Sequence, residues 1–115
     1  MLNEELALRR RTSAEIRQAI ALLPPPVIVA GDFNMPADSL IYRESWDGYA
    51  NAFSRSGFGY GLSEMVDLHG LQFGIRIDHI LTGAGLASCR CALGPGVGSD
   101  HLPLIAEICR VPERN

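Results

Sequence analysis

The chain has 115 residues, which is the size of one ordinary globular domain, so we expect residues 1–115 to form a single domain. Hydrophobic residues make up 47% and charged residues 20% of the sequence, a balance that excludes global disorder. The net charge of −3 argues against a broad basic surface that would bind nucleic acid by charge alone. The longest apolar runs are interrupted by the prolines at 24–26 and are too short to span a membrane.

The N-terminal residues and the cysteines favour a reducing, cytoplasmic location. The first five residues are acidic in character and lack the basic and apolar regions of a secretory signal. Cys89, Cys91 and Cys109 form neither the even set of a disulfide framework nor a zinc-binding spacing. We therefore expect all three cysteines to be small buried apolar residues.

The first predicted element is a helix ahead of the three prolines. Four apolar residues follow the spacing of one helix face: Ile16, Ala19, Ile20 and Leu23. Residues 12–15 have the form of a capping box, which favours a start near Ser13. Leu2 and Leu6 are also compatible with the helix and favour an earlier start, so its first residue stays open by a turn or more.

Residues 27–30 follow the prolines as a short apolar run rich in β-branched residues, which predicts a central strand buried on both faces. After a loop, Ser39 is expected to cap a second helix that passes Trp46. We expect that helix to end near Tyr49 or Phe53.

The second half of the sequence predicts a flexible glycine-rich loop at 57–61 and then three strands, near 75–81, 88–93 and 102–108. Two helices and at least four strands indicate a two-layer α/β (α+β) fold, with a mixed β-sheet and helices on one face. Several strands carry apolar residues on both faces. The other face of the sheet therefore needs a cover that the sequence does not obviously supply.

Polar and ionisable residues cluster at three places where predicted strands meet loops. The clusters are Gly-Asp-Phe-Asn at 31–34, Arg-Ile-Asp-His at 76–79 and Gly-Ser-Asp-His at 98–101. Strand ends from distant parts of a chain can meet at one crevice, where loops commonly hold binding residues. Carboxylates brought together disfavour one another's ionisation unless a cation neutralises them, and oxygen ligands suit Mg²⁺ or Mn²⁺. The clusters therefore predict a metal site.

Each cluster also has an ordinary structural interpretation. Asp32 and Asn34 can be turn residues that follow a strand. An ionised Asp78 within a strand needs a partner, for which a salt bridge to Arg76 is the simple alternative. Either histidine of these clusters can be a satisfied core residue, and we interpret His79 in that way. The three clusters in this order favour a functional site over these alternatives.

Together the clusters resemble the endonuclease/exonuclease/phosphatase superfamily, which includes deoxyribonuclease I, abasic-site endonucleases, sphingomyelinases and inositol polyphosphate phosphatases. Residues 31–34 are similar to its GD-[FL]-N motif, residues 76–80 to its R-[IL]-D-[YH]-[IFV] strand and residues 99–103 to its S-D-H-x-P motif. The resemblance covers nearly the whole chain and corresponds to the family's C-terminal half. It implies half of a four-layer α/β/β/α sandwich of the DNase I-like type.

The resemblance also implies a reaction, the metal-dependent hydrolysis of a phosphodiester or phosphomonoester, with nucleic acid among the candidate substrates. Asp32 and Asn34 would orient or deprotonate the attacking water and hold a phosphate oxygen. Asp100 would bind Mg²⁺ or Mn²⁺. His101 would act on the scissile phosphate as an acid/base or as a positively charged stabiliser, and Asp78 would hydrogen-bond its other ring nitrogen.

The family's N-terminal half contributes an asparagine, the principal metal-binding glutamate and a mid-chain histidine or tyrosine, for which this sequence shows no counterpart. Residues 61–63 also depart from a Gly-x-Thr-[YF] segment that is common in the family. We therefore expect the isolated chain to bind divalent metal weakly. The alternative function is a catalytically inactive half-domain that acts as a structural, self-associating module.

The resemblance implies partners as well. In the family, two sheets pack face to face between outer helices, so a lone C-terminal half would expose the sheet face that normally meets the other sheet. We expect this face to be covered either by a second copy, in a symmetric homodimer, or by a separate N-terminal half.

Overall fold

The computed structural model describes residues 2–57, 64–68 and 71–112 of the chain. The first half holds three helices and two strands: α1 (Leu2–Ala21), β1 (Ile28–Asp32), α2 (Leu40–Trp46), β2 (Ala50–Asn51) and α3 (Ala52–Ser56). The second half holds five strands: β3 (Glu64–Leu68), β4 (Leu71–Ile75), β5 (Asp78–Thr82), β6 (Leu86–Leu93) and β7 (Leu104–Arg110).

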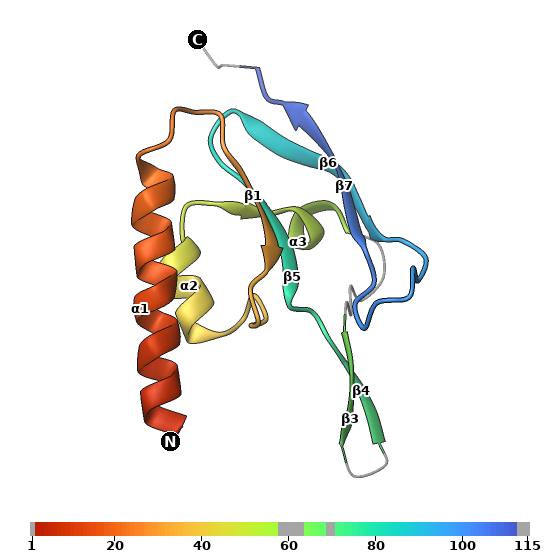
Figure 1. Cartoon of the computed structure of the whole chain (residues 1–115). Helices are drawn as coiled ribbons and strands as arrows, with labels where there is room; N and C mark the ends of the chain where they lie inside the picture. Colours follow the sequence, from red (N-terminus) through yellow and green to blue (C-terminus); the bar gives the residue numbers. More distant parts are fainter. Residues whose placement is uncertain (1, 58–63, 69–70, 113–115) are drawn as a thin grey trace.

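The strands form a three-stranded sheet in the order β1-β5-β2 and two hairpins, β3-β4 and β6-β7. All of these named pairs are antiparallel, and one isolated parallel bridge joins Gly57 to Cys91. Figure 1 shows α1 and α2 on one side of β1 and β5, with β6 and β7 on the other side and the β3-β4 hairpin projecting from the body. The expected α+β class is confirmed.

The main core forms where α2 packs on β5. The Ser39 hydroxyl accepts a hydrogen bond from the Tyr42 backbone N–H at 3.1 Å, so α2 begins with the predicted cap. One face of this helix is buried against Leu81, a fully buried residue of β5. The buried members of this cluster are Met35, Ile41, Tyr42, Trp46 and Leu81. The core therefore lies directly beneath the loop that follows β1.

Helix α2 ends earlier than the sequence predicts. The last helical residue is Trp46, and Asp47 is the C-cap. Gly48 then adopts a φ of 92°, in the left-handed region that favours glycine. Phe53 belongs to a separate helix, α3, whose N-cap is Asn51. α3 buries Phe53 against Cys91 of β6 in a second, smaller cluster.

Helix α1 starts at Leu2 and not near Ser13, so the earlier of the two possible starts is correct. Its predicted apolar face is only partly used. Ile20 packs against the main core, whereas Ile16 and Leu23 are exposed. Ile16 is exposed because a cavity of about 440 Å³ lies between α1 and β1, so that the helix packs on α2 more than on the sheet. Leu23 is exposed because the helix already ends at Ala21, two residues before it.

The prediction that residues 27–30 form a strand buried on both faces is wrong. β1 is an edge strand that pairs with β5, and no strand of the described residues pairs with its other edge. Ile28 is consequently 52% exposed. The apolar run therefore indicated the strand correctly but not its environment, which depends on neighbours that the local sequence does not specify.

The strand expected at 75–81 is divided in the structure. Residue 75 ends β4, and β5 begins at Asp78 after an irregular step that buries Ile77. The β3-β4 hairpin was not predicted. The loop expected at 57–61 lies almost wholly outside the described residues. The last two strands, β6 and β7, confirm the strands expected near 88–93 and 102–108.

The cysteine prediction is correct only for Cys91, which is free and buried. Cys89 and Cys109 form a disulfide between β6 and β7. The register of the hairpin shifts between Ser88 and Arg90, and this irregularity places Cys89 beside Cys109. Sequence spacing could not show this, because the pairing depends on the register of two strands. In the described part of the chain, no helix has the length and apolar character needed to cross a bilayer.

Candidate active site

Two strands place the first pair of predicted site residues. Asp32 is the last residue of β1 and Asp78 is the first of β5, and the antiparallel register sets them directly opposite each other. The chain then turns sharply, because Asn34 adopts a left-handed φ of 55° and donates its backbone N–H to Asp32 Oδ1 at 2.8 Å. Asp32 and Asn34 thus form the turn of the ordinary interpretation, and this turn also fixes the Asp32 carboxylate at the end of the strand.

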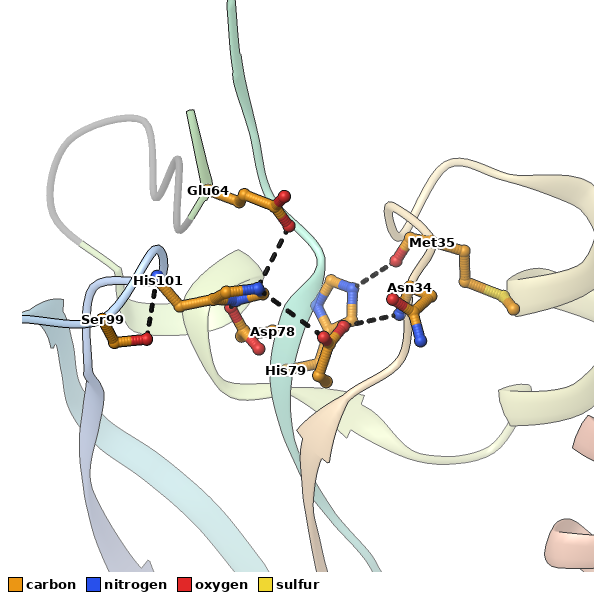
Figure 2. A network of polar contacts seen from close by, with 8 residues as sticks. Asn34, Met35, Glu64, Asp78, His79, Ser99 and His101 are labelled. Atoms are coloured by element: carbon orange, nitrogen blue, oxygen red, sulfur yellow. Dashed lines mark hydrogen bonds and ion pairs between the residues drawn. The ribbon is translucent and has the colours of Figure 1, made fainter. Parts of the chain in front are cut away.

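The contact predicted between Asp78 and His101 is present. His101 Nδ1 donates to Asp78 Oδ2 at 2.6 Å, and the His101 backbone N–H donates to Ser99 Oγ at 3.2 Å. The Asp78 contact holds the loop before β7 against the start of β5, and the Ser99 contact, drawn in Figure 2, is made within that loop. Arg76, which lies between β4 and β5, donates to Ser54 Oγ at 2.9 Å.

A third carboxylate, which the sequence analysis missed, faces the other nitrogen of the same ring. Glu64 Oε2 lies 3.1 Å from His101 Nε2, and Asp32 Oδ2 lies 3.7 Å from it. Glu64 is the first residue of β3, and a backbone bridge to His101 sets it in place. Glu64 lies outside the three motifs, so no sequence signal marks it. Its position depends on the unpredicted β3-β4 hairpin.

These carboxylates determine the charge of His101. The hydrogen bond to Asp78 raises the pKa of His101 above its usual value, the negative charges of Asp78, Glu64 and Asp32 raise it further, and partial desolvation opposes them. Carboxylates face both ring nitrogens in the network drawn in Figure 2, so the arrangement favours the doubly protonated, cationic form of His101.

His79, one strand position away from Asp78, has the opposite character. It is 1% exposed, its Nε2 donates to the Met35 carbonyl at 2.8 Å, and its Nδ1 accepts from Asn51 Nδ2 at 3.0 Å. Burial lowers the pKa of His79, so the ring is neutral. The interpretation of His79 as a satisfied core histidine is confirmed. Its bond to Met35 also supports the turn that carries Asp32.

A cavity of about 390 Å³ opens over this arrangement, lined by the ends of β1 and β5 and by the loop before β7. Asp32, Asp78 and His101 can each present one ligand atom within 4.8 Å of the others. Asp100 is exposed in the adjoining loop and is not one of these three. Figure 2 shows the Asn34 side chain pointing away from His101. The structure therefore brings Asp32, Asp78 and His101 together, while Asp100 and the Asn34 side chain lie outside this group of three.

The chemistry of the donors fits a divalent cation. Three carboxylates, those of Asp32, Glu64 and Asp78, surround a single histidine ring, so the arrangement carries excess negative charge whether or not that ring is protonated. Carboxylate oxygens are the ligands that Mg²⁺ and Mn²⁺ prefer, and a cation would allow an anionic substrate to approach.

Comparisons with known proteins identify the family and the fold of the chain. The model of the Endonuclease/Exonuclease/phosphatase family matches residues 4–101. The chain superimposes on an endonuclease/exonuclease/phosphatase from Bacteroides vulgatus with a TM-score of 0.69 and 22% identity, covering 90% of this chain and 44% of that one. An endonuclease/exonuclease/phosphatase family protein from Bacteroides thetaiotaomicron gives a TM-score of 0.69 and 19% identity, over 87% and 44% of the two chains.

The mannosyl-6-phosphatase Bt3783 of Bacteroides thetaiotaomicron is also similar in structure, with a TM-score of 0.59 and 19% identity over 88% of this chain and 44% of that one. Among curated proteins, no sequence gives a significant match. The chain spans less than half the length of these solved structures, which confirms the expected partial DNase I-like fold. The chain belongs to the endonuclease/exonuclease/phosphatase family.

Proposed function

We propose that this chain is the C-terminal half of a divalent-metal-dependent phosphoesterase, which hydrolyses a phosphodiester or a phosphomonoester. The observation that carries the proposal is the His101 ring, which Asp78 holds at 2.6 Å at the end of two paired strands and whose cationic form the neighbouring carboxylates favour. A fixed cation beside carboxylates is suited to stabilising the charge that develops on a phosphate during hydrolysis. Family membership supports a hydrolase of phosphate esters in general.

Each residue has a role that its position allows. His101 lines the cavity, and its Nε2 can donate to a phosphate oxygen or to the leaving group, while Asp78 keeps the ring oriented. Asp32 can orient or deprotonate the attacking water. In this proposal the Asn34 side chain, which points away here, turns towards the phosphate when substrate binds.

Asp100 and Asp32 are the residues proposed to hold Mg²⁺ or Mn²⁺, with Asp78 and Glu64 contributing charge. A bound cation supplies Lewis-acid stabilisation of the phosphate. Because these few carboxylates are partly exposed, we expect the isolated chain to bind the metal weakly. Additional carboxylate ligands from an N-terminal half would strengthen the site.

Hydrolysis assays test this proposal with one probe of each ester class. We expect Mg²⁺- or Mn²⁺-dependent hydrolysis of bis(p-nitrophenyl) phosphate, a diester, or of p-nitrophenyl phosphate, a monoester. The monoester is included because a structurally similar protein is a mannosyl-6-phosphatase. The same assay with His101→Ala is the control, because activity that survives the substitution indicates a contaminant. Absence of hydrolysis at every metal concentration, also after addition of a family N-terminal half, would contradict the proposal.

A second candidate is a self-associating half-domain without catalysis. It is favoured by the edge of β1 with which no described strand pairs, and by large apolar side chains that remain exposed, among them Ile28, Val97 and Ile105. A symmetric homodimer would bury these groups in both copies. Light scattering at micromolar concentration distinguishes a monomer from a homodimer. A self-associating half-domain predicts a particle with twice the 12.5 kDa mass of the chain.

A further inference from the structure

Glu64 occupies the position at His101 that a phosphate oxygen would take. Asp78 already fills the Nδ1 side of the ring at 2.6 Å, so Nε2 is the nitrogen left to bind a substrate. Glu64 Oε2 lies 3.1 Å from that nitrogen, as Figure 2 shows. A phosphate that approaches Nε2 must therefore displace this carboxylate or share the imidazolium with it.

The Glu64 carboxylate cannot move far from the bound phosphate. Glu64 begins β3, and its backbone bridges the backbone of His101. Its side chain is 29% exposed, the same fraction as that of His101, so both groups lie in a partly enclosed setting where charges are less screened than in bulk water. After displacement, the carboxylate would remain about one side-chain length from the substrate.

The repulsion between Glu64 and the substrate scales with the charge of the substrate. A phosphodiester carries one negative charge, whereas a phosphomonoester carries close to two above its second pKa of about 6. Asp32 adds to the negative charge at Nε2, and Asp78 places a further negative charge at Nδ1 of the same ring. Each carboxylate therefore penalises a dianion about twice as much as a monoanion.

We propose that Glu64 is a specificity-determining residue that favours monoanionic phosphodiesters over dianionic phosphomonoesters at His101. This inference rests on the proposed function, because it takes the ligand of Nε2 to be a phosphate ester. It differs from the proposed function in concerning relative affinity, which can be measured without turnover.

The experiment uses two probes of matched chemistry, dimethyl phosphate as the monoanion and methyl phosphate as the dianion. Each is titrated at pH about 8, with a constant Mg²⁺ concentration, into the full chain and into Glu64→Gln, and the NMR signals of the His101 ring report binding. We expect Glu64→Gln to improve the affinity for methyl phosphate, relative to dimethyl phosphate, by about tenfold. Glu107→Gln is the matched control, since it removes one charge from β7 outside the residues that line the His101 cavity.

Two results would overturn the inference. One is a ratio of affinities that is unchanged in Glu64→Gln, or that changes equally in Glu107→Gln. The other is a failure of both probes to bind Glu64→Gln at the His101 ring. Failure of the proposed function has a different signature, because the affinity ratio would shift as expected while neither aryl phosphate ester is hydrolysed by the complete site.

Discussion

The regions around His79 and His101 use the same side chain for opposite purposes. His79 lies in the core between the turn after β1 and Asn51, where two neutral groups bond its ring and burial keeps it uncharged. His101 lies at the edge of the cavity, where carboxylates face both ring nitrogens and raise the pKa of the ring, which favours its charged form. The partners of each ring, and not the residue type, determine whether the histidine stabilises the fold or acts on a ligand.

The largest expected effect comes from separating His101 from its carboxylate partner. Asp78→Asn should lower any phosphate ester hydrolysis about 100-fold while the fold stays intact, because the ring loses the group that fixes its orientation and its charge. Steady-state assays with saturating Mg²⁺, together with circular dichroism, check this. Unchanged turnover in Asp78→Asn would show that the pair does not support catalysis. Asp47→Asn, at the exposed end of α2, is the matched control.

The next effect should be on stability, and it should appear at the other histidine. His79→Ala leaves the Met35 carbonyl and the Asn51 side chain without their partner in the core, which should lower the free energy of unfolding by about 3 kcal/mol. His101→Ala should cost less than half as much, since that ring is partly exposed. Urea unfolding of both variants measures the difference. Equal losses would remove the distinction between a core and a site histidine.

A smaller effect should follow from opening the disulfide that connects β6 to β7, the hairpin that ends next to the His101 loop. Replacing Cys89 and Cys109 together with alanine should lower the free energy of unfolding by about 2 kcal/mol, because the unfolded chain gains freedom. The hydrogen bonds at His79 lie on other elements, so its NMR signals should not move. A shift of the His79 signals, or no loss of stability, would contradict this account of the two regions.

Much of the fold could be predicted because its signals are local. Ser39 as a cap of α2 and the strands of β6 and β7 depend on neighbouring residues along the chain. The exposure of β1 and the pairing of Cys89 with Cys109 could not be predicted, because both depend on which strands lie beside one another. Position within a sheet is a property of the whole fold.

The site divides in the same way. Asp78 and His101 were predicted as partners from the family motifs, and the structure confirms their contact. Glu64 was missed because it belongs to no motif and reaches His101 only through the β3-β4 hairpin. Asp100 stays a prediction, since its exposed loop position neither supports nor opposes a metal contact.

The smallest effect is the pH dependence of stability, in which the two histidines should act in opposite directions. The folded chain raises the pKa of His101, so its stabilising contribution is complete below the unfolded value of about 6.5 and disappears as the pH rises through the raised pKa. The folded chain lowers the pKa of His79, so stability falls as the pH drops below about 6.5. Urea unfolding at pH 6 and pH 8 should therefore show a larger advantage of the natural chain over His101→Gln at pH 6. An advantage that grows towards pH 8 would reverse the assigned sign.

The most direct test of the central claim is an NMR titration of the ring signals of both histidines in one sample, with His101→Ala used to identify the His101 signals. The structure predicts that His101 titrates above the usual value of about 6.5 and His79 below it. It also predicts that Asp78→Asn lowers the pKa of His101 while leaving that of His79 nearly unchanged. The reason is that the hydrogen bond from His101 to Asp78 is the largest cause of the raised pKa of His101, whereas Asp78 is a minor influence on His79. If His101 instead titrates at or below 6.5, the carboxylates do not hold it as a cation and the proposed site is not formed in solution.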